Sequence, residues 1–181
     1  LVADSVGKYY PGSPYVAALR SQVDTADANE ELARMVCESI CNPASYPDIA
    51  LPDMYGDIRR LSAVGEKVIL LDFWAAAAPG SAIYNAELRE VYDRFATSGF
   101  EIYQVGTDTD RQAWTNAVQA QALPWISVCD FRGLDGIAPR IYNIDRVPAN
   151  YLIDASGEIV GRNIPADRLA EQVERLVGKK R

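Results

Sequence analysis

The chain has 181 residues, of which 49% are hydrophobic and 24% are charged, and its formal net charge is −7. This composition is typical of a globular domain with a sizeable core, and the negative charge argues against nucleic acids and anionic membrane surfaces as partners. Histidine is absent, which excludes Ser-His and Cys-His nucleophile pairs. No apolar run approaches the ~18 residues of a membrane span. The sequence therefore predicts no metal, no cofactor and no membrane-spanning segment.

The first part of the chain predicts one interrupted helix or two short helices within residues 14–41, ended by Asn42-Pro43. Cys37 and Cys41 lie one helical turn apart beside the apolar face of this stretch. Unpaired cysteines usually pack as small apolar residues, and that is the interpretation we favour. The alternative is a redox pair, although a Cys-x3-Cys spacing within one helix fits disulfide geometry poorly. We expect residues 1–46 to form a helical extension.

From residue 47 onward, strand and helix patterns alternate. This order predicts a mixed central sheet covered by helices on both faces, in one domain over residues 47–181. Asp108 or Asp110 is expected to cap the second helix. The expected elements are a hairpin within 48–63, a buried strand from 68, a helix from 81 to about 98, a strand at 100–105, a helix ended by Leu123-Pro124, a strand at 125–128, a short helix within 134–142, a strand hairpin at 147–162, and a last helix from Pro165.

Two stretches carry a family resemblance. Asp72-Phe73-Trp74-Ala75 precedes a four-residue turn, Ala78 to Ser81, and Val147-Pro148 precedes the strand Leu152-Ile153-Asp154. In order and spacing they resemble the thioredoxin-like superfamily over about residues 47–177. The hairpin ahead of them is similar to that of the bacterial, membrane-anchored TlpA/ResA type of the AhpC/TSA-like proteins. The resemblance implies a three-layer α/β/α fold and a thiol-disulfide oxidoreductase ancestry.

In that family the turn is Cys-x-x-Cys, and here its two cysteine positions hold Ala78 and Ser81. The first family cysteine attacks a substrate disulfide as a thiolate, and the second resolves the mixed disulfide. A methyl group has no nucleophilic chemistry, and a serine hydroxyl does not exchange with sulfur. We expect Ser81 to serve as the N-cap of the helix that follows, because serine is among the best N-cap residues. No intact catalytic residue is therefore predicted at this turn.

The resemblance also assigns the residues around the turn. Asp72 aligns with the buried acid that helps deprotonate the resolving cysteine, and without that cysteine we expect it to be buried and hydrogen-bonded. Pro148 aligns with a cis-proline that leaves the preceding backbone free to pair with an extended peptide. The implied peptide-binding groove consists of Trp74, Pro79, Val147 and Pro148. Cys129 is expected to be a buried, inert thiol.

These expectations predict a redox-degenerate domain that binds an extended peptide or protein partner as an accessory module of the bacterial cell envelope. The envelope location follows from the family, and we expect anchoring through a segment ahead of residue 1. The alternative is an active thiol-disulfide oxidoreductase. In that case its catalytic cysteines were substituted at positions 78 and 81, or Cys37 and Cys41 supply the redox couple.

Overall fold

The computed structural model describes residues 46–178. The helices expected within residues 14–41, with Cys37 and Cys41, therefore lie outside the described residues. None of the described helices is both long enough and apolar enough to cross a membrane.

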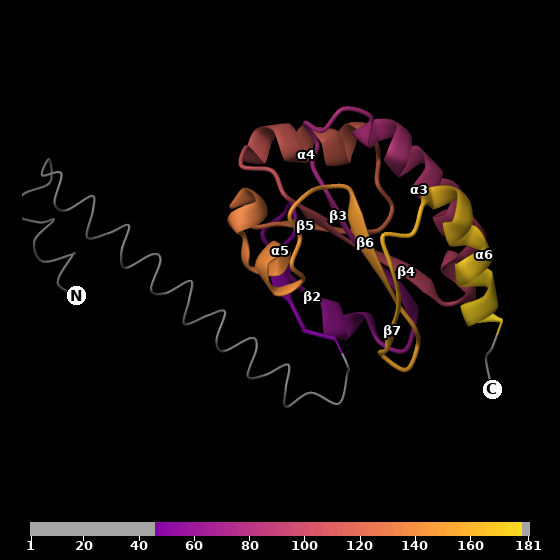
Figure 1. The fold of residues 1–181 in the computed structure, drawn as a ribbon. Coiled ribbons are helices and arrows are strands. Elements are labelled where there is room, and N and C mark those ends of the chain that lie inside the picture. Colours follow the sequence, from indigo (N-terminus) through magenta and orange to yellow (C-terminus); the bar gives the residue numbers. More distant parts are fainter. Residues whose placement is uncertain (1–45, 179–181) are drawn as a thin grey trace, which may run out of the picture.

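The domain is built on a five-stranded sheet with the order β5-β4-β3-β6-β7. Figure 1 labels these strands. The three strands β3, β4 and β5 run parallel, and β6 and β7 are antiparallel to their neighbours. The predicted mixed sheet is thus confirmed. The strands are β3 Val68–Trp74, β4 Phe100–Gly106, β5 Ile126–Cys129, β6 Ala149–Ile153 and β7 Ile159–Arg162.

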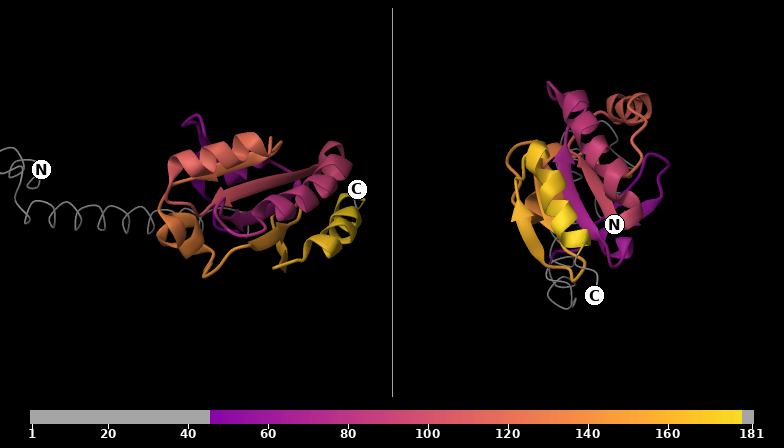
Figure 2. Two further views of the ribbon diagram at one scale, coloured as in Figure 1. Left: turned by 90° about the horizontal axis from the view of Figure 1, so that it is seen from above. Right: turned by 90° about the vertical axis from the view of Figure 1, so that its right-hand side faces the viewer.

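Four α-helices and one small hairpin complete the described part of the chain (Figures 1 and 2). The hairpin expected within residues 48–63 pairs β1 with β2 antiparallel, and the isolated bridge Asp53–Val128 joins it to β5. Short 3₁₀ turns cover Leu61–Val64, Ala96–Ser98 and Gly133–Asp135. The remaining elements are β1 Ala50–Pro52, β2 Ile58–Arg60, α3 Ser81–Phe95, α4 Arg111–Ala120, α5 Ile137–Ile141 and α6 Ala166–Val177.

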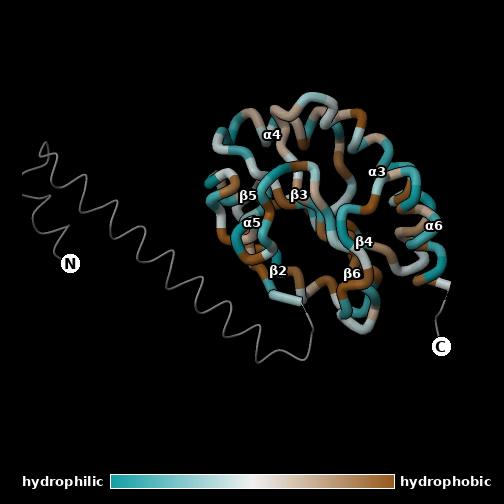
Figure 3. The backbone as a smooth tube through the Cα atoms, in the orientation of Figure 1, coloured by the Kyte–Doolittle hydropathy of each residue, from teal (hydrophilic) through white to brown (hydrophobic). Residues whose placement is uncertain are grey.

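The central strand β3 is buried along its whole length because apolar layers cover both faces of the sheet. Ile69, Leu71 and Phe73 point to one face, where they meet the hairpin and the region of α5. Val68 and Leu70 point to the other face, where α3 and α6 supply the apolar partners. In Figure 3, α6 alternates hydrophilic and hydrophobic stretches, as expected for a helix that buries one face.

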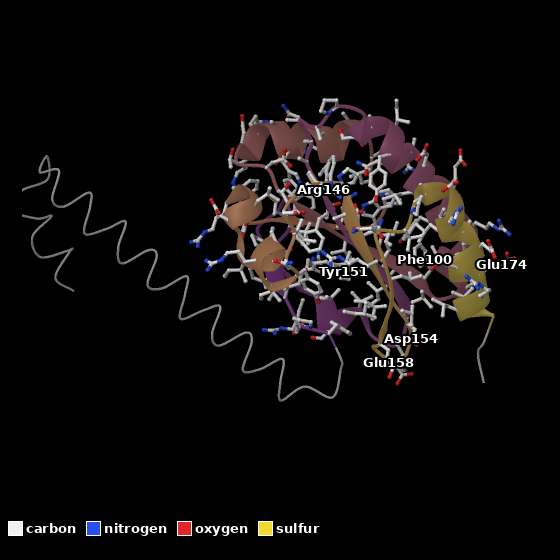
Figure 4. All side chains as sticks on the ribbon, in the orientation of Figure 1. Phe100, Arg146, Tyr151, Asp154, Glu158 and Glu174 are labelled. Carbon is white, nitrogen blue, oxygen red and sulfur yellow. The ribbon has the colours of Figure 1, made fainter. Side chains whose placement is uncertain are left out.

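Both stretches that carry the resemblance lie at the end of the sheet where β3 and β4 finish. There, the chain leaves β3, turns into α3, and lies next to the loop that leads into β6. Figure 4 labels Arg146 on that loop, and it labels Asp154 and Glu158 at the tip of the β6–β7 hairpin at the opposite end. The Val147–Pro148 peptide bond is cis, as the resemblance implies.

Candidate functional site

The loop that joins β3 to α3 is held by the loop that follows β4. The backbone N–H of Ala76 donates to Oδ1 of Asp108 at 2.9 Å and lies 3.1 Å from Oδ2. Thr107 fixes the start of the loop, since its backbone N–H donates to the carbonyl of Trp74 at 2.8 Å. Burial raises the pKa of Asp108, and the backbone hydrogen bonds oppose that rise. Asp108 is therefore a positioning residue of this site.

The prediction that Asp108 or Asp110 caps the helix α4 is confirmed, and the structure assigns that role to Asp110. Its Oδ1 accepts from the backbone N–H groups of Gln112 at 2.8 Å and Ala113 at 3.2 Å. Asp108 comes two residues earlier and reaches back to the β3–α3 loop instead. No local sequence signal distinguishes the two aspartates, because the partner of Asp108 is 32 residues away.

The prediction that Ser81 caps α3 is wrong. The helix begins at Ser81 itself, and its N-cap is Gly80, which takes a left-handed conformation with φ 81° and makes no side-chain cap. The Oγ of Ser81 donates instead to the carbonyl of Ala76 at 3.2 Å. Glycine adopts this backbone conformation without the steric cost of a Cβ, so it takes the boundary position and places the serine one residue inside the helix.

A small cavity of about 60 Å³ opens beside these residues. It is lined by Ala78 and Ser81, the positions that hold the cysteines in the family motif, together with Pro148. No charged residue lines it. The lining residues are Trp74, Ala75, Ala78, Pro79, Gly80, Ser81, Tyr84 and Pro148.

The structure thus brings together three of the four residues expected to form the groove: Trp74, Pro79 and Pro148. Trp74 contributes little surface, since its side chain is 1% exposed and packs with Trp114 in a buried cluster. Val147 does not line the cavity, because its half-buried side chain packs against the core on the other face of the sheet. Sequence reasoning missed Tyr84, which lies one turn into α3.

Asp72 is completely buried below the cavity, on the face of the sheet that α3 covers. The hydroxyl of Tyr84 donates to its Oδ1 at 2.5 Å, and Nε2 of Gln104 donates to its Oδ2 at 3.0 Å. Burial raises the pKa of Asp72 to about 6, and these two hydrogen bonds oppose the rise. Both carboxylate oxygens of Asp72 are therefore satisfied by side chains of the described residues.

A larger polar network surrounds Asp72. Nε2 of Gln104 also donates to Oδ1 of Asn85 at 2.8 Å, and its Oε1 accepts from the indole of Trp125 at 3.0 Å. From β6, Nδ2 of Asn150 lies 3.5 Å from the Tyr84 hydroxyl and donates to the carbonyl of Ile164 at 3.0 Å. Such connected networks rigidify a core, and this one joins α3, β3, β4 and β6 beneath the cavity.

The described part of the chain contains one cysteine, Cys129 at the end of β5. Its thiol is fully buried, and burial raises its pKa to about 12. The backbone N–H of Phe131 lies 3.4 Å from its Sγ. A buried thiol of high pKa is neither a nucleophile nor a good metal ligand at neutral pH. The described residues 46–178 therefore contain no reactive thiol.

Three features of this structure together define a thioredoxin-like domain. They are the strand order of the mixed sheet, the turn that leads from the central strand β3 into α3, and the cis-proline before the adjacent antiparallel strand β6. The family model described as AhpC/TSA family matches residues 44–162, and the chain belongs to this family.

Individual relatives agree with this assignment. The chain is 27% identical over 132 residues to "Thiol-disulfide oxidoreductase ResA" of Geobacillus kaustophilus. This alignment covers 73% of this chain and 74% of that protein. The C-terminal domain of a putative thiol-disulfide oxidoreductase from Bacteroides thetaiotaomicron superposes with a TM-score of 0.68 at 29% identity, covering 75% of this chain and 95% of that one. An uncharacterized thioredoxin-like protein from Bacteroides vulgatus is 34% identical, with a TM-score of 0.66, covering 74% and 87%. The domain is thus thioredoxin-like and belongs to a family of thiol-disulfide oxidoreductases.

Proposed function

We propose that this domain has lost the redox chemistry of its family and binds an extended polypeptide at the former active site. The observation that carries the proposal is the cavity itself, in which a methyl group and a hydroxyl occupy the two cysteine positions. The surrounding scaffold is complete, and the buried acid Asp72 is satisfied by Tyr84 and Gln104. The turn lacks both thiols of the family motif, while the surrounding described residues keep the supporting structure.

The surface around the cavity supports binding of an extended segment. The backbone N–H and C=O of Val147 form no hydrogen bond with any of residues 46–178. Exposed apolar side chains lie on the two loops and on the first turn of α3, where Ile83 is 70% exposed. A strand-like peptide can pair its backbone with Val147 and place alternate side chains on this surface. The other exposed apolar residues are Ala77, Pro79, Ala82 and Pro148.

The partner we propose is an extended peptide or protein segment in the bacterial cell envelope. The location rests on the resemblance to anchored relatives, and the domain would act there as an accessory module. Within the chain, residues 47–181 would form the binding domain, and residues 1–46 a separate extension that connects it to an anchor.

The binding proposal is tested by selecting a random-peptide display library against the full chain. We expect enriched peptides that bind the chain and lose binding to Ala78→Arg, which places a charge in the cavity. The control is Tyr55→Arg on the β1–β2 turn, where the side chain is 81% exposed, and this variant should bind as the unmodified chain does. Failure to enrich any peptide, or equal binding to Ala78→Arg, would contradict the proposal.

A further inference from the structure

The hydrogen bonds around Asp72 have a direction that a donor at the edge of the network fixes. The indole Nε1 of Trp125 can only donate, and it donates to Oε1 of Gln104 at 3.0 Å. The amide of Gln104 therefore presents its Nε2 to Oδ2 of Asp72, at 3.0 Å. A proton on Oδ2 would face this donor. A neutral Asp72 carboxyl therefore carries its proton on Oδ1, the oxygen that faces Tyr84.

The amide of Asn150 is fixed in the same way. Its Oδ1 accepts from the backbone N–H of Ile164 at 2.8 Å, so its Nδ2 is the atom that lies 3.5 Å from the Tyr84 hydroxyl. Two side chains thus meet the oxygen of Tyr84 within the network. Asn150 presents a donor in every state, whereas Oδ1 of Asp72 is an acceptor when ionised and a donor when protonated.

The protonation state of Asp72 therefore decides where the hydroxyl hydrogen of Tyr84 points. When Asp72 is ionised, the hydroxyl donates to its Oδ1 at 2.5 Å. When Asp72 is neutral, its Oδ1–H donates to the Tyr84 oxygen, and the network offers no acceptor for the Tyr84 hydrogen. Tyr84 also lines the cavity, together with Ala78 and Pro148. The cavity is thus the side to which the released hydrogen turns.

The surroundings of Asp72 favour its neutral form. The carboxyl meets Tyr84 from α3 and Gln104 from β4, with Asn150 of β6 beyond the tyrosine, and these side chains are uncharged. Besides Asp72, the charged group that acts on Tyr84 is Glu87 of α3, which raises the pKa of the tyrosine further. Burial without a cationic partner raises the pKa of Asp72 to about 6, so the carboxyl changes its charge between pH 4 and pH 8.

We propose that Asp72 and Tyr84 form a proton-controlled hydrogen-bond donor for the cavity, which serves an oxygen acceptor bound there when Asp72 is protonated and is withdrawn when Asp72 ionises. On proton uptake the hydroxyl hydrogen moves to Oδ1 of Asp72, and the Tyr84 oxygen takes one proton from the cavity side. The ligand class is an uncharged oxygen acceptor such as an amide carbonyl. The inference goes beyond the proposed function, since any acceptor of this class serves.

The test is an NMR titration of the full chain with N,N-dimethylacetamide at pH 4 and pH 8. The carbonyl oxygen of this probe accepts hydrogen bonds, and the probe has no N–H or O–H of its own. The signals followed are the methyl group of Ala78 and the ring of Tyr84. We expect the probe to bind about threefold to tenfold more tightly at pH 4, which is the effect of one additional hydrogen bond.

Two variants should fix the donor in opposite states. In Asp72→Asn the side-chain oxygen faces Nε2 of Gln104, so the new amide donates to Tyr84 as the protonated acid does. This variant should bind the probe at pH 8 as tightly as the unmodified chain does at pH 4. Tyr84→Phe has no hydroxyl and should bind weakly at both pH values. Asp135→Asn changes an exposed aspartate and should keep the pH dependence.

Equal binding at the two pH values, or no shift of either signal at pH 4, would overturn the proposal. A pH dependence that survives in Tyr84→Phe would show that another group is responsible. An Asp72→Asn variant that binds at pH 8 as weakly as the unmodified chain would also count against it. The display selection judges the proposed function separately, because a chain that selects no peptide still shows or lacks this preference for the acceptor probe.

Discussion

The hydroxyl of Tyr84 donates a 2.5 Å hydrogen bond to Oδ1 of Asp72 and also lies beside the cavity at the start of α3. Asp72 stands at the position of the family's buried acid, and Ser81 stands where the family has its resolving cysteine. The contact with Tyr84 gives Asp72 a structural partner in place of that cysteine. Asp72 fixes the tyrosine that forms one wall of the cavity. The acid is thus a positioning residue for the cavity, whose two motif positions hold Ala78 and Ser81.

Replacing Asp72 with asparagine should change how the free energy of unfolding depends on pH. Burial raises the pKa of Asp72 from its usual 3.8 to about 6, so the folded state binds the proton more tightly than the unfolded state does. The stability due to this group is complete below the unfolded pKa and is lost as pH rises through about 6. At about 1.4 kcal/mol per pH unit, the loss amounts to about 3 kcal/mol at pH 7.

We therefore expect the unfolding free energy of Asp72→Asn, relative to the unmodified chain, to rise by about 2 kcal/mol between pH 4 and pH 7, since part of the effect is already present at pH 4. Urea titrations over this range measure it. The control is Asp135→Asn, which changes an exposed aspartate. If the unfolding free energies of Asp72→Asn and the unmodified chain differ by the same amount at every pH, the pKa of Asp72 is not raised.

Tyr84→Phe should destabilise the chain more at pH 7 than at pH 4. Removing the hydroxyl leaves the Asp72 carboxylate with one donor, Gln104, and losing a hydrogen bond to a buried charge costs about 1–3 kcal/mol. At pH 4 the carboxyl is protonated and the loss is smaller. Tyr55→Phe, at a tyrosine that is 81% exposed, is the matched control and should change little. An equal loss at both pH values would contradict the proposed contact.

Asp108→Ala should loosen the loop of the candidate site. The change removes both acceptors of the Ala76 N–H, so hydrogen exchange at the Ala76 amide should become faster and the chain should lose about 1–3 kcal/mol of stability. Asp110→Ala, which removes the cap of α4, should cost about 1 kcal/mol and leave Ala76 exchange unchanged. Unchanged exchange at Ala76 in Asp108→Ala would mean that another group holds the loop.

Cys129 should resist alkylation in the folded chain. Its thiol is fully buried and its pKa is about 12, so at pH 8 the thiolate is scarce and shielded. Peptide mapping after iodoacetamide treatment measures it separately from Cys37 and Cys41. Ser156→Cys, on the exposed turn of the β6–β7 hairpin, provides the reactive reference. Modification of Cys129 at the rate of this reference would contradict the burial.

The fold could be predicted from the sequence because its elements have strong local signals. The apolar run from Val68 gives β3, the helical spacing of Leu88 and Phe95 gives the buried face of α3, and Asn42-Pro43 precedes the whole domain. The strand pattern at 147–162 predicts the final hairpin, the resemblance implies the cis bond before Pro148, and the structure contains both.

The details of the site could not be predicted, because they depend on contacts between distant residues. Gln104 and Asn150 have no local feature that marks them as partners of Asp72 and Tyr84, and their separations in the chain are 32 and 66 residues. Ser81 was misassigned because a good N-cap residue stood next to a glycine that takes the cap position. The burial of Trp74 depends on Trp114 from α4, which no motif reveals.

The loss of redox chemistry is tested by an insulin disulfide-reduction assay of the full chain beside its Ala78→Cys/Ser81→Cys variant. We expect the chain to be inactive and the variant to reduce insulin, because the scaffold is retained and the turn lacks only the two thiols. Turnover by the unmodified chain would contradict the proposed function. The reaction would then have to use Cys37, Cys41 or Cys129, and its loss on Cys37→Ser would identify the first of these.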